Sequence, residues 1–523
     1  MKKLVLFLVL SISPFILNSQ SFVRSELSTT VSTPWEILYG PDDFLWITES
    51  GGKVSRIDPL NGNKNVVYTA SDYFGGSPLE NSPLCPNSAI GSGTLGLALH
   101  PDFSNLATAY IYFVYSYNSG TVSNPATKFR IKRLEWDASS NTVISDSNIV
   151  NSITTGYDHL GGRLMAIKQN NVPYLFLTIG DNGKSEDSDP TCYSPQSSNP
   201  NNFTQDVTTQ NGKIHRFNVD GSIPSDNPIV GNSFYTRGHR NPQGLMYNPN
   251  LEIIYSIEHG DRTDDEINIL HKGMNYGWKD VRGYHGDNSF PGEANYVASY
   301  IPHPQIANDS LVEPLFAWCN TPDTSGFWLD WCTVAPSGGA YYGSNGIPEW
   351  TNSLLVVTLK EGLTTNKEVF QFKLKPNGEL MESTSTNPNP KKFFGSDQVL
   401  NGRLRDIAIS NDGLSIYLVN NGGTPADKIT VYQYNKTTSI NDFNSRQYNV
   451  KLYPNPAIDV LTLKGLENYP DFREARISSL LGKSSTLKFD QNYAIDVSRL
   501  ANGIHFLNLI FESSIYTLKF IKI

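Results

Sequence analysis

The chain has 523 residues, of which 38% are hydrophobic and 17% are charged, and its formal net charge at pH 7 is −9. The length leaves room for one large domain and a smaller module. The acid excess lies between residues 20 and 448, because Lys and Arg outnumber Asp and Glu in both end segments. A body this acidic argues against nucleic-acid binding, which depends on neutralising phosphates with basic side chains.

Residues 1–20 read MKKLVLFLVLSISPFILNSQ, with two lysines ahead of an apolar run. This pattern predicts a secretory signal peptide that is removed on export. A buried N-terminal strand is the alternative interpretation. No later segment approaches the roughly 18 consecutive apolar residues of a membrane span, so we expect no transmembrane span in the mature chain.

Most of the chain consists of short apolar or alternating runs separated by turns rich in Pro, Asn, Asp and Gly. Such turns occupy residues 40–43, 100–103, 248–250 and 410–413. Each unit therefore has the pattern strand, tight turn, strand. Hairpins that recur over about 400 residues favour an all-β fold, a β-propeller, over a set of β-sandwiches.

The composition changes near residues 435–449, which are polar and lack periodicity. We expect a linker there, followed by strand-like pieces that form a small C-terminal β-sandwich module. The expected organisation is a signal peptide (1–20), a propeller (21–436), a linker (437–447) and the C-terminal module (448–523).

The four cysteines are Cys85, Cys192, Cys319 and Cys332. An exported chain with an even number of cysteines can form two disulfides, and four cysteines allow three pairings. We favour Cys319–Cys332, because these two are close in sequence and flank a loop, with Cys85–Cys192 as the remaining pair. None of the four has the spacing of metal ligands.

A series of motifs points to a family. They are LGLALHPDF (95–103), DHLGGRL (158–164), TIGDNG (178–183), RGHRNPQGLMYNPN (237–250), EHGDRTDDEINILHKGMNYGWKDVRGY (258–284), WCTVAPS (331–337) and RLRD (403–406). In this order they resemble the soluble, calcium-dependent quinoprotein sugar dehydrogenases, which use pyrroloquinoline quinone (PQQ) on a six-bladed propeller. The resemblance covers about residues 28–435. It implies an oxidoreductase that converts an aldose to a lactone by hydride transfer to PQQ, with an electron acceptor that the sequence does not identify.

The expected catalytic residues are His159, Asp158 and Arg240. Oxidation at the anomeric carbon requires removal of the hydroxyl proton, and a neutral histidine suits that role near pH 7. A neighbouring carboxylate can orient the imidazole. The resemblance accordingly implies His159 as the general base, Asp158 as its orienting neighbour, and Arg240 close to the reacting centre.

The expected quinone-binding residues combine cations with an aromatic ring. PQQ carries three carboxylates, so it requires clustered positive charge, and Arg403 and Arg405 would project the same way from a strand. By resemblance the quinone-binding set is Arg240, Asn241, Trp331, Thr333, Lys360, Arg403 and Arg405.

Calcium is the second expected cofactor. It prefers six to eight oxygen ligands from carboxylates and carbonyls. The resemblance implies that the carbonyls of Gly260 and Asp261 hold the calcium that bridges to the quinone. It also implies a second, structural calcium site at Glu266, Tyr276, Tyr284 and Asp287.

Several positions depart from the family pattern. Gly91 and Glu186 stand where close members have glutamines, Asp261 replaces a proline, and Trp328 replaces a tyrosine. These changes leave open a non-catalytic secreted propeller that binds glycans or a protein partner. A propeller lactonase is a third possibility, which would need calcium in the central channel but no cluster of Arg and Lys.

The C-terminal module has a resemblance of its own. The segments LYPNPAID (452–459), ISSLLGK (477–483) and DVSRLANGI (496–504), with the basic and apolar end of the chain, resemble a type IX secretion sorting domain. This implies contact with the type IX secretion machinery and a secreted or cell-surface location. A carbohydrate-binding or adhesion sandwich is the alternative.

Overall fold

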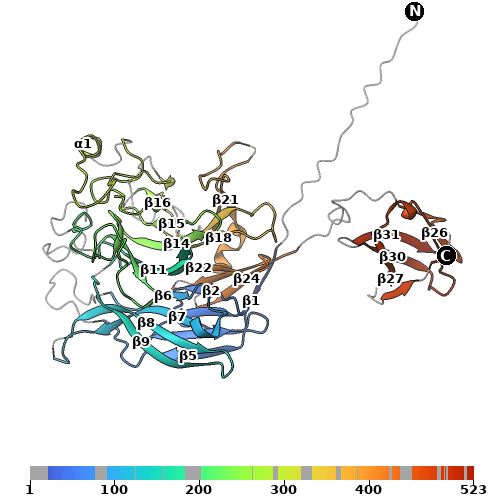
Figure 1. Cartoon of the computed structure of the whole chain (residues 1–523), viewed down its shortest axis with the longest axis horizontal. Helices are drawn as coiled ribbons and strands as arrows, with labels where there is room; N and C mark the ends of the chain where they lie inside the picture. The colour runs from blue at the N-terminus through green and yellow to red at the C-terminus, as the bar shows by residue number, and fades with distance from the viewer. Residues whose placement is uncertain are drawn as a thin grey trace, which may run out of the picture. The chain divides into compact units, whose positions relative to one another are not determined.

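The computed structural model divides the chain into two compact units, Met1–Asn435 and Lys436–Ile523. It describes residues 22–76, 91–123, 125–156, 158–182, 202–261, 263–286, 292–319, 332–360, 367–385, 387–422, 427–435, 450–479, 484–487, 489–490, 493–511 and 515–523. The expected signal peptide and linker lie outside these described residues. Figure 1 shows both units, which are almost entirely built of strands.

The described part of the first unit forms six four-stranded antiparallel sheets. The first three sheets contain β2 (Ile37–Tyr39), β3 (Leu45–Glu49), β4 (Lys53–Ile57) and β5 (Lys64–Thr69); β6 (Thr94–Leu99), β7 (Tyr110–Asn118), β8 (Thr127–Asp137) and β9 (Thr142–Ile153); and β10 (Leu164–Gln169), β11 (Val172–Ile179), β12 (Lys213–Asn218) and β13 (Phe234–Arg237).

The other three sheets contain β14 (Pro242–Asn248), β15 (Ile253–Glu258), β16 (Asp265–Ile269) and β17 (Phe316–Trp318); β18 (Pro336–Tyr342), β19 (Ser353–Thr358), β20 (Val369–Lys373) and β21 (Lys391–Phe393); and β22 (Leu404–Ile409), β23 (Ser415–Asn420), β24 (Ile429–Tyr434) and β1 (Phe22–Glu26). The helices described in this unit are short: α1 (Glu293–Ala298), α2 (Gln398–Asn401) and the 3-10 turns Leu106–Thr108 and Gly395–Asp397. No helix among the described residues is long and apolar enough to cross a membrane.

The six sheets close into a ring. The innermost strands contact one another in the order β2, β6, β10, β14, β18, β22 and back to β2. The last sheet takes its outer strand, β1, from the N-terminal end of the unit, and Phe22 of β1 pairs with Tyr434 of β24. This closure leaves few exposed strand edges and confirms the expected six-bladed propeller.

Large side chains fill the space between neighbouring blades. Trp46 on β3 is fully buried, and its ring packs edge-on against Phe103 and Trp136 of the next blade, with centroids 5.6 and 5.0 Å apart. All five residues of β3 are buried, as expected for a strand covered on both faces. The abundance of aromatic residues in the sequence is thus used for packing between sheets.

Four of the inner strands, β6 among them, begin with an irregular register. The pairing of β14, β18 and β22 with the next strand skips one residue in each case, which leaves Gln243, Ser337 and Arg405 as the extra residues. Such a β-bulge changes the direction of a side chain and is common beside functional sites.

The C-terminal unit consists of two sheets around one core. The three-stranded sheet contains β25 (Lys451–Tyr453), β26 (Val460–Lys464) and β29 (Ala494–Asp496), and the four-stranded sheet contains β28 (Ser484–Leu487), β27 (Phe472–Ser479), β30 (Gly503–Phe511) and β31 (Ile515–Lys522); a 3-10 turn lies at Leu466–Asn468. Leu461 and Ile495 from the first sheet share a buried cluster with Leu507 and Phe520 from the second. The unit is therefore the expected small β-sandwich.

Candidate active site

One edge of the propeller collects the residues singled out from the sequence. The inner strands β10, β14, β18 and β22 begin at the edge where their antiparallel neighbours β11, β15, β19 and β23 end, so loops from several blades meet near the axis. The residues at or near these strand ends are His159, Asp181, Arg240, Asn241, His259, Thr333, Lys360, Arg403 and Arg405.

His159 is held by a buried aspartate that follows β11, the second strand of its blade. Its Nδ1 lies 2.8 Å from Oδ1 of Asp181, a residue with no exposed surface. Asp181 also accepts a hydrogen bond from the indole Nε1 of Trp278 at 3.0 Å. Since a carboxylate only accepts, Nδ1 carries the hydrogen of a neutral imidazole and Nε2 carries the lone pair.

Asp158 lies differently from the expected orienting neighbour. Its Oδ1 accepts a bond from the backbone N–H of His159 at 2.8 Å, and its Oδ2 is 3.7 Å from Nε2 of that ring. The carboxylate is 63% exposed, so it contributes charge on the Nε2 side of His159. The contact that orients the ring belongs to Asp181, which the sequence analysis did not select although it lies in the TIGDNG motif.

Arg240 is positioned through its backbone. Its N–H donates to Oε2 of Glu258 at 3.0 Å, while Oε1 of Glu258 lies 2.9 Å from Nδ1 of His239. The guanidinium lies 5.6 Å from the ring centroid of Trp278, and its NH1 donates to the carbonyl of His259 at 3.4 Å. Arg240 and His159 are therefore linked to the same tryptophan, which brings two of the expected catalytic residues together.

His259 lies at the centre of the cationic residues. Its pKa is held well below the usual value, first by burial and then by the charges of Arg240, His159, Arg405 and Arg403. These four side chains come from three segments, the loops before β10 and β14 and the start of β22, and therefore face one region. The sequence analysis placed His259 beside matched positions but gave it no role.

Arg405 and Asn241 are joined through Gln243. NH2 of Arg405 donates to Oε1 of Gln243 at 2.8 Å, and Nε2 of Gln243 donates to Oδ1 of Asn241 at 2.7 Å. Burial, followed by the nearby charges of Arg163 and Arg403, lowers the pKa of Arg405 to about 9. Because Arg405 is the extra residue of a bulge, strand alternation does not describe its direction relative to Arg403.

The remaining expected quinone-binding residues are near this group or outside the described part. NH1 of Arg403 donates to Oδ1 of Asn421 at 3.2 Å, and burial lowers the pKa of Arg403. Lys360 is buried, and its backbone N–H donates to the carbonyl of Val334, the neighbour of buried Thr333. Trp331, Trp328 and Glu186 lie outside the described residues.

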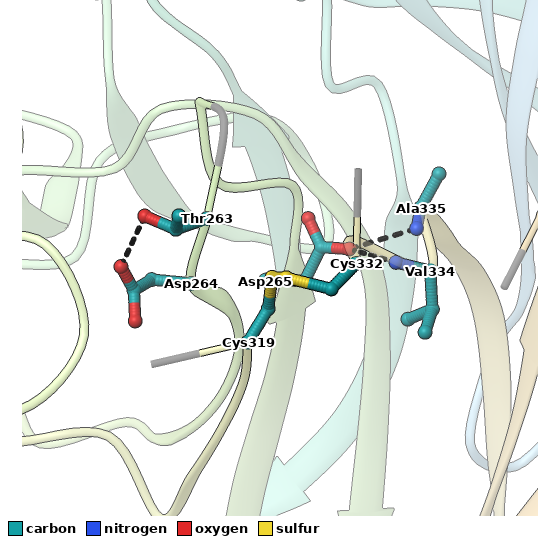
Figure 2. Close-up of a disulfide and its surroundings, with 7 residues drawn as sticks. All are labelled: Thr263, Asp264, Asp265, Cys319, Cys332, Val334 and Ala335. Carbon is teal, nitrogen blue, oxygen red and sulfur yellow. Dashed lines mark hydrogen bonds between the residues drawn. A yellow bond between two sulfur atoms is a disulfide. The ribbon is translucent and has the colours of Figure 1, made fainter. Parts of the chain in front are cut away.

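The acidic loop after β15 is organised by Asp265 (Figure 2). One carboxylate oxygen of Asp265 accepts bonds from the N–H groups of Val334 and Ala335 at 2.6 and 2.8 Å, and the other accepts from Gly260 at 2.9 Å. A Cβ at Gly260 would collide with the carbonyl oxygens of Thr263 and Asp264, so only glycine fits there. The carboxylate of Asp261 is 3.0 Å from Arg282. Oxygen for a cation at this loop would therefore come from backbone carbonyls rather than from that carboxylate.

The residues of the expected second calcium site are partly assembled. Glu266 and Tyr276 line one small pocket with Glu258 and Asp264. Burial and then the charge of Glu258 hold the pKa of Glu266 well above its usual value. The hydroxyl of Tyr284 accepts a bond from the N–H of Ala317 at 3.3 Å, and Asp287 lies outside the described residues. The described residues contain no cluster of three or more His, Cys, Asp or Glu side chains arranged as metal ligands, so this site stays a prediction.

A disulfide joins Cys319 and Cys332, as expected, with the two Cα atoms 5.5 Å apart. Figure 2 shows it beside Asp264 and Asp265. It closes the loop that carries Trp331 and so links β17 to the segment of Thr333. Cys85 and Cys192 lie outside the described residues, so the second pairing stays a prediction.

Arg163 forms a separate cluster on the propeller axis. Its NH1 lies 2.8 Å from Asp406 and 3.1 Å from Glu36, and its Nε and NH2 donate to the carbonyls of Gln243 and Ser337. Burial and the charge of Asp406 outweigh the effect of Arg163 and raise the pKa of Glu36 to about 8. This cluster connects five blades, and no local sequence pattern identified it.

The edge of the propeller that carries Arg240, His259 and Arg405 fits an anionic, oxygen-rich group. The Nε atoms of Arg240 and Arg405 and Nε2 of His259 are buried, and they have no hydrogen-bond partner among the described residues. Buried donors of this kind require acceptors. The position of Gly91 offers no side chain to such a group, and its N–H donates to the carbonyl of Gly156 at 2.7 Å.

Comparison with protein families decides the relationship of the chain. A family model described as Glucose / Sorbosone dehydrogenase matches residues 31–426. The chain belongs to this family. A second model, the Secretion system C-terminal sorting domain, matches residues 451–523. Both resemblances inferred from the motifs are thereby confirmed, and the C-terminal unit implies handling by a secretion system.

Individual relatives agree with this assignment. The chain is 31% identical over 449 residues to quinoprotein glucose dehydrogenase B of Acinetobacter calcoaceticus, covering 77% of this chain and 86% of that protein. It is 29% identical to aldose sugar dehydrogenase YliI of Escherichia coli K12, covering 74% and 87% respectively. The solved structure of the PQQ-bound aldose sugar dehydrogenase of Streptomyces coelicolor has a TM-score of 0.54 and 21% identity, covers 80% of this chain and 99% of that chain, and supports the fold.

Proposed function

We propose that this protein oxidises an aldose at its anomeric carbon to the lactone, as an exported enzyme that binds PQQ and calcium. The observation that carries this proposal is the pairing of His159 with buried Asp181 beside a cluster of unsatisfied cationic donors. When bound, PQQ would supply a two-electron acceptor for the hydride of the sugar, and calcium would supply Lewis acidity. The sugar thus loses two electrons and two protons. One proton leaves with both electrons as the hydride, and the protein must accept the other.

The protein removes that proton through His159. The contact between Nδ1 and Asp181 leaves the lone pair on Nε2, which can accept the proton of the anomeric hydroxyl. The resulting imidazolium is stabilised by Asp181 on one side and by the exposed charge of Asp158 on the other. In this proposal both aspartates support the base, and Asp181 also sets its tautomer.

The cationic residues would hold the cofactor. Arg240, Asn241, Lys360, Arg403 and Arg405 would bind carboxylate and carbonyl oxygens of PQQ, and Thr333 and Trp331 would complete the set. The carbonyls of Gly260 and Asp261 would hold calcium, since the Asp261 carboxylate is paired with Arg282. A structural calcium at Glu266, Tyr276, Tyr284 and Asp287 belongs to the same proposal.

The proposed destination is the cell surface or the exterior, by way of the predicted signal peptide and then the type IX machinery. The sorting-domain match at residues 451–523 supports the second of these steps. The proposed partners are therefore a small aldose, an electron acceptor of unidentified nature and the secretion machinery.

Reconstitution with PQQ and calcium tests the proposal. Quinone binding is followed by absorbance, and turnover by reduction of an artificial electron acceptor across a panel of aldoses. We expect His159→Ala to lower kcat by about 10²–10⁴-fold, because it removes the general base, with quinone affinity largely retained. Asp158→Asn, which keeps the size of an exposed side chain, serves as the matched variant with a smaller loss. Failure of the wild-type protein to bind quinone, or to oxidise any aldose, would favour the non-catalytic propeller.

A further inference from the structure

A chain of hydrogen bonds with a defined direction runs from β22 to the loop after β15. It begins at Arg405, whose NH2 donates to Oε1 of Gln243 at 2.8 Å. A guanidinium has no acceptor, so the oxygen of the Gln243 amide must face Arg405. The amide nitrogen of Gln243 therefore points the other way.

The direction continues through Asn241 to His259. Nε2 of Gln243 lies 2.7 Å from Oδ1 of Asn241, which turns the amide nitrogen of Asn241 towards Nδ1 of His259 at 3.4 Å. An amide nitrogen only donates, so Nδ1 of His259 must accept. The imidazole is therefore neutral and carries its hydrogen on Nε2, as the network dictates.

This Nε2–H points to a missing acceptor. Nε2 of His259 is buried and has no hydrogen-bond partner among the described residues. Its ring lines the small pocket that also contains Arg240, Gly260 and Trp278. A buried donor without an acceptor destabilises a protein, and such a group is expected to bind a ligand atom or a water molecule.

We propose that His259 donates its Nε2–H to an oxygen of the bound quinone, and that Gln243 is the positioning residue that keeps His259 in the donor tautomer. The inference rests on the proposed function, because it takes PQQ as the ligand. Gln243 acts without touching the cofactor. Because its amide oxygen must accept from Arg405, its amide nitrogen must donate to Asn241, and the orientation of the Asn241 amide then sets the tautomer of His259. The bulge at the start of β14 makes this possible, because Gln243 is its extra residue.

The tautomer is tested before any quinone is added. In the full chain labelled with ¹⁵N-histidine, the signals of His259 are identified by their loss in His259→Gln, and we expect the Nε2-protonated form. In Gln243→Glu the carboxylate can only accept, so the Asn241 amide should turn over and the His259 proton should move to Nδ1. Gln243→Met, which neither donates nor accepts strongly, should give a mixture of both tautomers. An Nδ1-protonated wild type, or the same tautomer in all three proteins, overturns the relay.

The role of His259 is tested by quinone affinity in the presence of calcium. We expect His259→Leu to bind PQQ at least about tenfold more weakly, since it loses one hydrogen bond to a polar ligand. His259→Gln should stay within about threefold of the wild type, because its amide nitrogen can replace Nε2. His100→Gln is the matched control: His100 is also buried and its Nδ1 accepts from Asp102, but it lies outside the site.

The outcomes separate this inference from the proposed function. If the wild type binds PQQ and His259→Leu binds equally well, the role of His259 is wrong and the proposed function stands. If the wild type binds no PQQ, both are overturned. If the PQQ affinity of His259→Gln falls as far as that of His259→Leu, a hydrogen bond donated by this side chain does not explain the affinity, and the inference also fails.

Discussion

Two buried arginines stand next to the same tryptophan and have opposite surroundings. Arg163 and Arg405 lie 4.4 and 4.3 Å from the ring centroid of Trp35. Arg163 meets two carboxylates and two carbonyls, and the carboxylates of Asp406 and Glu36 raise its pKa against the effect of burial. Arg405 meets the amide oxygen of Gln243, its Nε has no partner among the described residues, and burial lowers its pKa.

The difference separates a structural charge from one available to a ligand. A buried ion is tolerated when its partners are supplied by the fold, as for Arg163, and it costs stability when they are not. Arg405 keeps a buried charge that the described part of the fold leaves incompletely satisfied, which is expected where a bound anion supplies the remaining partner. The same residue type, just before β10 in one case and on β22 in the other, thus has two distinct uses.

The largest expected effect is the loss of stability when Arg163 is replaced. Arg163→Met leaves Glu36 and Asp406 buried together without a counter-charge, so we expect the free energy of unfolding to fall by about 3–5 kcal/mol. Chemical denaturation measures this loss. The triple variant with Glu36→Gln and Asp406→Asn removes both ionisable carboxyl groups and should recover part of the stability. If Arg163→Met is as stable as the wild type, Arg163 is not a structural charge and the distinction between the two arginines is wrong.

The next effect is on Arg405. Arg405→Met should weaken PQQ binding by about thirtyfold, since a charged hydrogen bond contributes about 2 kcal/mol. The free energy of unfolding should change by no more than about 1 kcal/mol, because the variant removes an incompletely satisfied charge. Titration with quinone and denaturation without it give the two numbers. A large loss of stability with unchanged affinity would show that Arg405 is structural, like Arg163.

The smallest expected effect is a pH dependence of the free energy of unfolding, which Glu36 of the Arg163 cluster causes. The pKa of Glu36 in the folded protein, about 8, lies above its ordinary value of 4.5, so the proton it holds stabilises the fold at low pH. This contribution is lost as the pH rises through 8, and we expect the free energy of unfolding to fall by about 1 kcal/mol between pH 7 and pH 9. Denaturation at both pH values measures it. Glu36→Gln cannot ionise and should lack this part of the decrease.

The sequence predicted the architecture and most of the candidate site, because both leave local signals. Repeated strand-turn-strand units indicated the propeller, and motifs such as DHLGGRL carried His159. The structure adds contacts between residues far apart in the chain. Asp181 is 22 residues from His159, and Gln243 is 162 residues from Arg405. No local pattern reports such distances.

The direction of the Arg405 side chain shows a second reason why the sequence did not predict the contacts within the site. Strand periodicity predicted that Arg403 and Arg405 project together, which assumes a regular ladder. The register skips Arg405, and an extra residue of this kind is set by the twist and closure of the ring rather than by its neighbours in sequence. The residues of the site could therefore be named from the sequence, while their partners required the fold.

The way the ring closes has a mechanical consequence. Strand β24, whose last residue Tyr434 precedes the C-terminal unit, lies between β1 and β23 and is bonded to both along its length. A pull transmitted to the end of β24 would therefore have to break hydrogen bonds on both sides of the strand, to β1 and to β23. The attachment point is thus a clamped strand. Tension applied to the sorting unit would be resisted by the N-terminal strand of the same chain.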